Sequence, residues 1–343
     1  MPEKSVVLGL SGGVDSACCA AMLKQQGYRV TGAFLSWGGA DGEDARRVAD
    51  ALGIDCLVVD MSEPLEREVI APFVEGYLHG RTPIPCVLCN PAVKLRLLFA
   101  VADRLGAGYV ATGHYARLGR SRAGYDALYR SPSRNDQAYM LYRLPYEWLG
   151  RLLLPLGEGM EKEEIRNRAR QAGISVHDKP DSMEICFIPD NDYAAFIESR
   201  GICPPPGDFV DEQGRVLGRH RGIHHYTVGQ RRGLGIAAEG RLYVTRIEPE
   251  ANRVVLSLND PQRAEIAVEC LHILAPELAA EDEFSALVRV RHGKTEVPAR
   301  VVRTGAGAAQ VLFDRPARAP SPGQSAVFFD ADGRVLGGGF ICR

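Results

Sequence analysis

The chain has 343 residues, of which 45% are hydrophobic and 24% charged, and its formal net charge is -2 at pH 7. This length allows two or three domains with separate cores, and the composition is that of an ordinary globular protein. No apolar run approaches the ~18 to 20 residues of a membrane span, and the first residues do not form a cleavable leader, so we predict a cytoplasmic protein without membrane contact.

The first 115 residues alternate strand-like and helix-like patterns. Residues 5–10, 29–35 and 55–61 predict buried strands, residues 15–27 and 42–53 predict helices that stop at a glycine, and residues 106–115 repeat the pattern of a strand followed by a loop. Such alternation is typical of βαβ units around a parallel sheet. We therefore predict an α/β fold for the N-terminal domain.

A glycine-rich loop, "GLSGGVDS" at residues 9–16, joins the first strand to the first helix. Adjacent glycines let the backbone approach a phosphate closely, and the helix N-terminus adds free N–H groups and partial positive charge. The loop lacks the lysine of kinase-type phosphate loops, so we expect Mg²⁺ to neutralise the phosphates, with Asp15 as the nearest carboxylate. It resembles the pyrophosphate loop (PP-loop) of the ATP pyrophosphatases.

Two cysteines stand in "RTPIPCVLCNP" at residues 81–91. Asn90 and Pro91 are typical of a helix start, which predicts that Cys89 lies directly before a helix N-terminus with Lys94 in the early turns. Both features favour the thiolate of Cys89. A third cysteine, Cys186, lies in "MEICFI", which predicts a short strand followed by a helix capped by Asp190 or Asn191.

Reduced thiols are the rule in the cytoplasm, so the nine cysteines are not expected to form a disulfide framework. Four of them lie in apolar or periodic segments and are predicted to be buried core residues: Cys18, Cys19, Cys56 and Cys270.

The pattern changes near residue 203, where a Pro/Gly-rich stretch precedes short alternating segments separated by turns. These segments predict two small β-rich, barrel-like modules. We place the domains at residues 1–202, 203–261 and 262–343. Two basic runs, residues 218–233 and 288–294, lie in the β-rich modules.

Seven motifs, in order and over almost the whole chain, are similar to those of the tRNA-specific 2-thiouridylases (the MnmA/TrmU family). They are "GLSGGVDS", "GRTPIPCVLCN", "ATGHYARL", "NDQAYML", "DSMEICFI", "HHYTVGQRRGLGI" and "SPGQSAVFFD...VLGGGFI". The resemblance implies an ATP-dependent enzyme that adenylates the C2 oxygen of uridine 34 in tRNA and replaces it with sulfur. It also implies that the modules after the first domain hold the anticodon arm.

The resemblance also implies roles for single residues. Cys89 would be the first catalytic thiol, Cys186 would carry a persulfide, and Asp15 would act with Mg²⁺. The implied phosphate-binding residues are Gly9, Leu10, Ser11, Gly12, Gly13, Val14, Asp15 and Ser16, with Leu35 and Gly113 at the adenosine. The implied tRNA contacts are His114, Asn135, Asp136, Gln137, Arg291, His292 and Gln324. The implied partners are tRNAs for Lys, Glu and Gln and a sulfur donor such as a cysteine desulfurase or a persulfide relay protein.

Two positions depart from the family pattern. Cys86 stands where many members have Asp, and Met183 stands where Gln or Thr is common. Two mechanisms therefore stay open: a persulfide on Cys186 with Cys86 as a spectator, or a 4Fe-4S cluster held by Cys86, Cys89 and Cys186. Three thiolates that leave one iron open favour the cluster, and zinc is disfavoured because the sequence offers no evident fourth ligand nearby.

Two other functions remain as alternatives. An amide-forming PP-loop synthetase, such as an NAD or GMP synthetase, would use the same loop without needing Cys89 and Cys186. A non-catalytic tRNA-binding or iron-sulfur module would not need an intact PP-loop.

Overall fold

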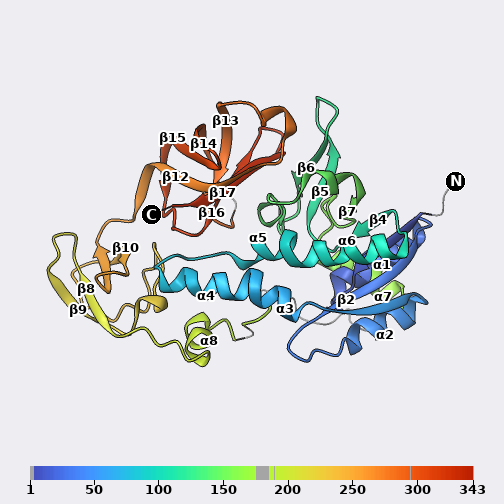
Figure 1. The fold of residues 1–343 in the computed structure, drawn as a ribbon, viewed down its shortest axis with the longest axis horizontal. Coiled ribbons are helices and arrows are strands. Elements are labelled where there is room, and N and C mark those ends of the chain that lie inside the picture. The colour runs from blue at the N-terminus through green and yellow to red at the C-terminus, as the bar shows by residue number, and fades with distance from the viewer. Residues whose placement is uncertain (1–3, 175–184, 189, 294, 343) are drawn as a thin grey trace.

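The three parts of the chain lie along the longest axis of the computed structural model (Figure 1). The structure describes residues 4–174, 185–188, 190–293 and 295–342. The PP-loop domain occupies one end, a small β-sheet module occupies the other, and a closed β-barrel lies between them against the connecting helices. The predicted fold class, a parallel-sheet domain followed by two β-rich modules, is confirmed.

The N-terminal domain is built on a five-stranded parallel sheet of order β3-β2-β1-β4-β7. Its strands are β1 (Ser5–Gly9), β2 (Arg29–Ser36), β3 (Asp55–Asp60), β4 (Tyr109–Ala111) and β7 (Leu152–Leu153). The strand order reverses at β1, since β2 lies on one side of it and β4 on the other. Ligands of open α/β sheets bind at the carboxyl ends of the strands at such a switch point.

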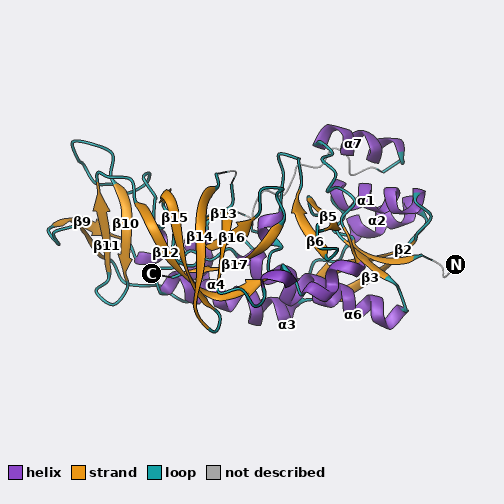
Figure 2. Ribbon diagram, turned by 90° about the horizontal axis from the view of Figure 1, so that it is seen from above, coloured by secondary structure: helices purple, strands orange, loops and turns teal. Residues whose placement is uncertain are grey.

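Helices cover both faces of this sheet (Figure 2). One face packs against α1 (Val14–Gln25) and α2 (Glu43–Leu52), and α7 (Lys162–Gln171) lies outside α1. The other face packs against α6 (Leu95–Leu105). Because neighbouring strand residues point to opposite faces, Val6 and Val7 of β1 belong to different cores.

The segment after the sheet's third strand is helical and packs into a separate core. It contains α3 (Ser62–Leu65), the π-helix η1 (Glu66–Ile70) and α4 (Ala71–Leu78). Phe73 and Tyr77 pack there against Phe187 and Tyr193, which precede or begin α8 (Tyr193–Ser199). This packing holds the Cys186 segment beside the helices of the first domain.

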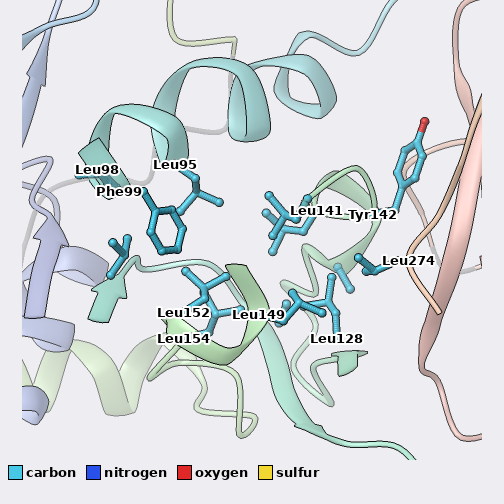
Figure 3. Packing of buried hydrophobic residues seen from close by; sticks show 14 of the residues in the cluster. Leu95, Leu98, Phe99, Leu128, Leu141, Tyr142, Leu149, Leu152, Leu154 and Leu274 are labelled. Atoms are coloured by element: carbon cyan, nitrogen blue, oxygen red, sulfur yellow. The ribbon is translucent and has the colours of Figure 1, made fainter. Parts of the chain in front are cut away.

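The cysteine pair lies in one continuous helix made of α5 (Pro85–Cys89), the π-helix η2 (Asn90–Lys94) and α6. By length and composition, Pro85–Leu105 could cross a membrane. Its apolar face is core, however, because Leu95, Leu98 and Phe99 are buried against the sheet and the segment that follows it (Figure 3).

Along the chain, a hairpin and two short helices lie between strands β4 and β7. The hairpin is β5 (Ala116–Arg120) with β6 (Asp126–Arg130), and the helices are η3 (Ala138–Met140) and η4 (Tyr146–Arg151). Leu128, Leu141 and Leu149 from this region share a core with Leu274 and Phe329 of the barrel. The barrel is therefore packed onto the N-terminal domain through apolar contacts, part of which Figure 3 shows.

The two β-rich modules have distinct topologies. The central module contains η6 (Ile223–His225) and a four-stranded sheet of order β10-β11-β8-β9, formed by β8 (Gly207–Val210), β9 (Val216–His220), β10 (Tyr243–Glu248) and β11 (Arg253–Ser257). The barrel closes in the order β12-β15-β14-β13-β16-β17. Its elements are β12 (Gln262–Ile273), η7 (Pro276–Leu278), β13 (Glu283–Arg289), β14 (Val297–Gly305), β15 (Ala308–Arg318), β16 (Ser325–Phe329) and β17 (Val335–Ile341).

Candidate active site

The PP-loop lies at the carboxyl end of β1 and leads directly into α1. Its conformation is fixed by its own serines: the Ser11 N–H donates to Ser16 Oγ (3.2 Å), and Ser16 Oγ donates to the Gly13 carbonyl (3.0 Å). Gly12 has φ +77°, and a Cβ added there would lie 2.5 Å from Cβ of Asp44 at the start of α2. Only glycine therefore allows the loop to pass so close to α2.

The residues predicted for adenosine lie around this loop. Gly113 and His114 follow the end of β4, and a Cβ added at Gly113 would lie 3.3 Å from Cβ of Asp15. Leu35 lies near the end of β2 and is partly buried between two cores. The switch point at β1 thus brings Leu35, Gly113 and the PP-loop to one edge of the sheet.

The Asp15 carboxylate already has two partners. Lys162 Nζ lies 2.8 and 2.7 Å from its two oxygens, and the Tyr115 hydroxyl donates to Oδ1 at 2.7 Å. Lys162 begins α7 and its ammonium also lies 5.4 Å from the centre of the Tyr115 ring. A cation that was not predicted from the sequence therefore lies beside the PP-loop, where it shares the Asp15 carboxylate that was predicted to act with Mg²⁺.

The prediction for the start of the cysteine helix was wrong. The helix begins at Pro85, so Cys86 and Cys89 lie in its first turn, and Asn90 is an interior residue instead of the N-cap. Its side-chain N–H donates to the Met140 carbonyl (3.0 Å). Pro91 lies in the π-helix η2, where the regular i to i−4 hydrogen bonds of an α-helix are interrupted. The helix therefore tolerates a residue without a backbone N–H at this position.

The surroundings of Cys186 also differ from the prediction. Ile185–Ile188 form a turn, closed by a hydrogen bond from the Ile188 N–H to the Ile185 carbonyl (2.8 Å), and no strand is present in the described part of this segment. The helix that follows is capped by Asp192, whose side chain accepts from the Ala195 N–H (2.9 Å). Met183 lies outside the described residues.

The candidate thiols and Lys94 are close enough to influence one another electrostatically. Lys94 lowers the pKa of Cys86 and of Cys89, whereas Cys186 raises both values. Cys89 is buried in the core that also holds Phe187 and Ile188, whereas Cys186 is exposed. The fold thus brings residues from two distant segments into one thiol cluster, which we define as Cys86, Cys89 and Cys186.

Burial decides the protonation of the helix thiols, contrary to the prediction of a ready thiolate. It raises the pKa of Cys89 to about 11, and Lys94 lowers that pKa by a smaller amount. Burial likewise raises the pKa of Cys86. For Lys94, burial lowers the pKa, but Cys89, Cys86 and Cys186 together raise it by more. Cys86 and Cys89 are thus thiols at neutral pH, and the Lys94 cation can stabilise the thiolate of either residue once it forms.

His114 lies in the loop after β4 and is close enough to Lys94 to be influenced by its charge. Its Nδ1 lies 2.8 Å from Thr112 Oγ1. Burial lowers the pKa of His114 to about 3, and the Lys94 cation contributes to that direction. The ring is therefore neutral at pH 7 and can donate or accept one hydrogen bond at each nitrogen according to its tautomer.

The residues predicted to contact tRNA come together at the border of the barrel. Arg289 Nη1 donates to Asp136 Oδ2 (3.0 Å), and the Tyr139 and His292 rings are 5.9 Å apart, so the loop after β6 lies beside the loop after β13. The other predicted contacts in these loops are Asn135, Gln137 and Arg291. Gln324 lies apart from them and donates to the Thr82 carbonyl (2.6 Å) on the approach to the cysteine helix.

Several of these side chains have partners within the protein. Asp136 Oδ1 accepts from the Ser131 and Ala138 N–H groups (3.0 and 3.3 Å), and Gln137 Oε1 accepts from the Tyr115 N–H (3.0 Å). Arg291 and His292 are exposed, and Arg291 Nη2 donates to the Arg318 carbonyl (3.2 Å).

Of the four cysteines predicted to be core residues, Cys18 and Cys19 are buried and Cys56 is half-buried. Cys270 is exposed, so that prediction was wrong. Cys270 has φ +51° and lies where the pairing of β12 with β17 changes register. At such an irregularity the alternation of buried and exposed residues along a strand is interrupted, so the sequence pattern does not predict which side chains are buried.

Family models match three consecutive parts of the chain. They are described as a tRNA methyl transferase HUP domain (residues 4–190), a tRNA methyl transferase PRC-barrel domain (195–258) and an aminomethyltransferase beta-barrel domain (263–341). Curated relatives match end to end. The chain is 44% identical to the tRNA-specific 2-thiouridylase MnmA of Carboxydothermus hydrogenoformans (99% of this chain, 98% of the relative) and 42% identical to that of Paramagnetospirillum magneticum (98% and 95%).

The parallel sheet, its switch point and the PP-loop define the class as a PP-loop ATP pyrophosphatase fold with two appended β modules. Identity above 40% over nearly the full length then shows the family. The chain belongs to the tRNA-specific 2-thiouridylase (MnmA) family, and the resemblance noted in its motifs is confirmed.

Proposed function

We propose that this enzyme is an ATP-dependent tRNA uridine 2-sulfurtransferase, which adenylates the C2 oxygen of uridine 34 and replaces it with sulfur to give 2-thiouridine. The observation that carries the proposal is the thiol cluster around Lys94, coupled through that lysine to His114 at the PP-loop edge. Two of the family models carry names of methyl transfer, but a PP-loop and three cysteines in one domain suit sulfur transfer to an adenylated oxygen. The curated relatives are named tRNA-specific 2-thiouridylases.

Adenylation makes a poor leaving group into a good one. The C2 oxygen attacks the α-phosphate of ATP, pyrophosphate leaves, and the oxygen later departs with AMP. The Ser11 and Ser16 hydroxyls and the N–H groups at the start of α1 can hold the phosphates. A Mg²⁺ ion held by Asp15 would supply further positive charge to the phosphates.

Two routes deliver the sulfur. In the persulfide route, the terminal sulfur of a Cys186 persulfide attacks C2 and AMP leaves. Cys89 then attacks the Cys186 sulfur, which breaks the persulfide bond, frees the thiocarbonyl and leaves a Cys89–Cys186 disulfide for an external dithiol to reduce. The exposure of Cys186 supports its loading by a donor protein.

In the cluster route, Cys86, Cys89 and Cys186 hold a 4Fe-4S cluster. Three cysteine thiolates from two segments would suit this cofactor, because three protein ligands leave one of the four irons open. Such a cluster would supply an open iron site for an added sulfide. The presence of Cys86 in the thiol cluster supports this route.

The partners follow from the family. We propose that the substrate is the anticodon arm of the tRNAs for Lys, Glu and Gln, gripped by Arg291 and His292 of the barrel together with the loop after β6. A cysteine desulfurase or a persulfide relay protein would supply the sulfur. The nine free thiols support a reducing compartment, which we take to be the cytoplasm.

A mercury gel tests the function. Unmodified tRNA incubated with the protein, ATP and a reduced sulfur source under anaerobic conditions should yield a retarded, thiolated band, and the band should need ATP, Cys89 and Cys186. Full ATP turnover with both cysteines replaced by Ser would favour an amide-forming synthetase. ATP binding without tRNA-dependent pyrophosphate release would favour a non-catalytic tRNA-binding module.

Anaerobic iron reconstitution separates the two sulfur routes. Stoichiometric iron, together with loss of activity in Cys86→Ser, would support the cluster. Full activity of iron-free wild-type protein and of Cys86→Ser would eliminate it and leave the persulfide route.

A further inference from the structure

A second group of metal-ligand side chains lies away from the thiol cluster, where α8 meets the central module. His224 Nε2 donates to Glu198 Oε1 at 3.0 Å, and His225 Nε2 lies 3.1 Å from the same oxygen. Each of the three residues has one ligand atom within 4.8 Å of the ligand atoms of the other two. Glu198 comes from α8 and the histidines come from η6.

The two imidazoles are held in place before any ligand arrives. The His224 side chain is only 1% exposed and that of His225 13%, and their rings are 4.2 Å apart. A Cβ added at Gly222 would lie 2.6 Å from Cε1 of His224, so the backbone closes behind that ring. The buried Nδ1 of His224 has no hydrogen-bond partner in the described residues, which leaves Glu198 as its ring's polar anchor.

We propose that Glu198, His224 and His225 bind a divalent transition-metal ion of the zinc type. Zinc–nitrogen and zinc–oxygen bonds of about 2.0 to 2.1 Å in a tetrahedron separate the ligand atoms by about 3.3 Å, close to the two separations seen here. Two imidazole nitrogens favour zinc over Mg²⁺ or Ca²⁺, which prefer oxygen ligands. Glu198 is 41% exposed, so water can reach the fourth position.

A filled site would fasten α8 to the central module. Because α8 follows the Cys186 turn and packs with it against α4, the ion would also limit how far that turn can move. The site differs from the thiol cluster in its ligands, which are nitrogen and oxygen atoms instead of sulfur.

Metal titration of a cysteine-depleted protein tests the proposal. The full chain with Cys86→Ser, Cys89→Ser and Cys186→Ser, stripped with a chelator, should bind one equivalent of Zn²⁺ and melt at a higher temperature when loaded. Co²⁺ should give the visible d–d bands of a four-coordinate ion without a sulfur-to-cobalt charge-transfer band.

Two substitutions at partly exposed ligands locate the site. Adding Glu198→Gln or His225→Gln to that background should weaken Zn²⁺ binding by more than the ~10- to 100-fold that loss of an outer-shell partner costs. The matched controls Glu75→Gln and His79→Gln, both at exposed positions, should leave the affinity unchanged. Circular dichroism would check that each variant folds.

The proposal is overturned if the cysteine-depleted protein binds no stoichiometric Zn²⁺, since the three residues would then form only a hydrogen-bonded cluster. It is also overturned if folded Glu198→Gln and His225→Gln proteins bind Zn²⁺ as tightly as the controls do.

Discussion

The reactivity of Cys89 is set by two opposing effects at one sulfur atom. Burial raises the pKa of its thiol to about 11, and Lys94 moves the pKa downward by less. Because the thiolate is the reacting form, the alkylation rate of Cys89 should rise about tenfold per pH unit between pH 7 and 9. Mass spectrometry of iodoacetamide-treated protein would measure this rate, and a plateau below pH 9 would contradict the assignment.

Lys94 should control the protonation of the helix thiols. In Lys94→Met, loss of the cation removes the effect that lowers the pKa of Cys86 and Cys89, so their alkylation profiles should move to higher pH and thiolation should slow. Arg96→Met, on the exposed side of the same helix, is the matched control. Unchanged alkylation in a folded Lys94→Met protein would refute this role.

Residues could be predicted from the sequence where a local pattern carries the chemistry. The PP-loop and the cysteines are of this kind, because glycine spacing and thiol chemistry are visible in short segments. Lys162 could not be predicted, since it begins a highly charged helix that looks like an ordinary solvated surface. Only the fold brings it to Asp15.

At the scale of elements, the cysteine helix shows where local signals compete. Asn90–Pro91 and Pro85 are both acceptable helix starts. The helix begins at the earlier one, Pro85, and passes through Asn90 and Pro91 as the π-helix η2. The predicted strands and helices of the parallel sheet are present, in contrast, because hydrophobic periodicity and terminal glycines agree there. The Cys186 segment was mispredicted as a strand because five hydrophobic residues in six look alike in a strand and in a buried turn.

Asn90, the first residue of the π-helix η2, is 1% exposed and ties this helix to η3 through its side-chain hydrogen bond to Met140. In Asn90→Ala, the Met140 carbonyl loses its donor from the Asn90 side chain. We expect the free energy of unfolding to fall by about 1 to 3 kcal/mol. Chemical denaturation would measure this change, with Arg96→Ala as a surface control on the same helix. A loss no larger than that of the control would show that the Asn90 contact does not anchor η2.

At the scale of the whole molecule, a buried ion network joins the barrel to the first domain. Arg289 Nη1 donates to Asp136 (3.0 Å) and its Nε to Glu296 (2.8 Å), and the three side chains are 7%, 11% and 15% exposed. The Arg289–Asp136 pair joins residues 153 positions apart, so it leaves no sequence signature. The barrel itself could be predicted from its alternating strands, but its docking on the first domain could not.

Breaking this network should loosen the docking of the barrel. Arg289→Met leaves Asp136 without its paired cation, whereas Glu296 keeps its ion pair with Arg130. Removal of one partner of a buried pair costs about 3 to 5 kcal/mol. We expect a matching loss in denaturant stability. Arg300→Met, an exposed arginine of β14 paired with Glu283, is the control. Equal stability of the two variants would contradict the structural role of Asp136.

The meeting of the three cysteines is the claim on which the enzyme mechanism depends. Mild oxidation of the iron-free protein with diamide, followed by digestion and mass spectrometry, tests it directly. The account predicts that Cys186 is linked to Cys89 or Cys86 in the folded protein, both without and with ATP. When the protein is unfolded before oxidation, links from Cys186 to Cys89 or Cys86 should be no more frequent than links from Cys186 to Cys203. Linkage of Cys186 in the folded protein only to Cys203 or to other distant cysteines would contradict it.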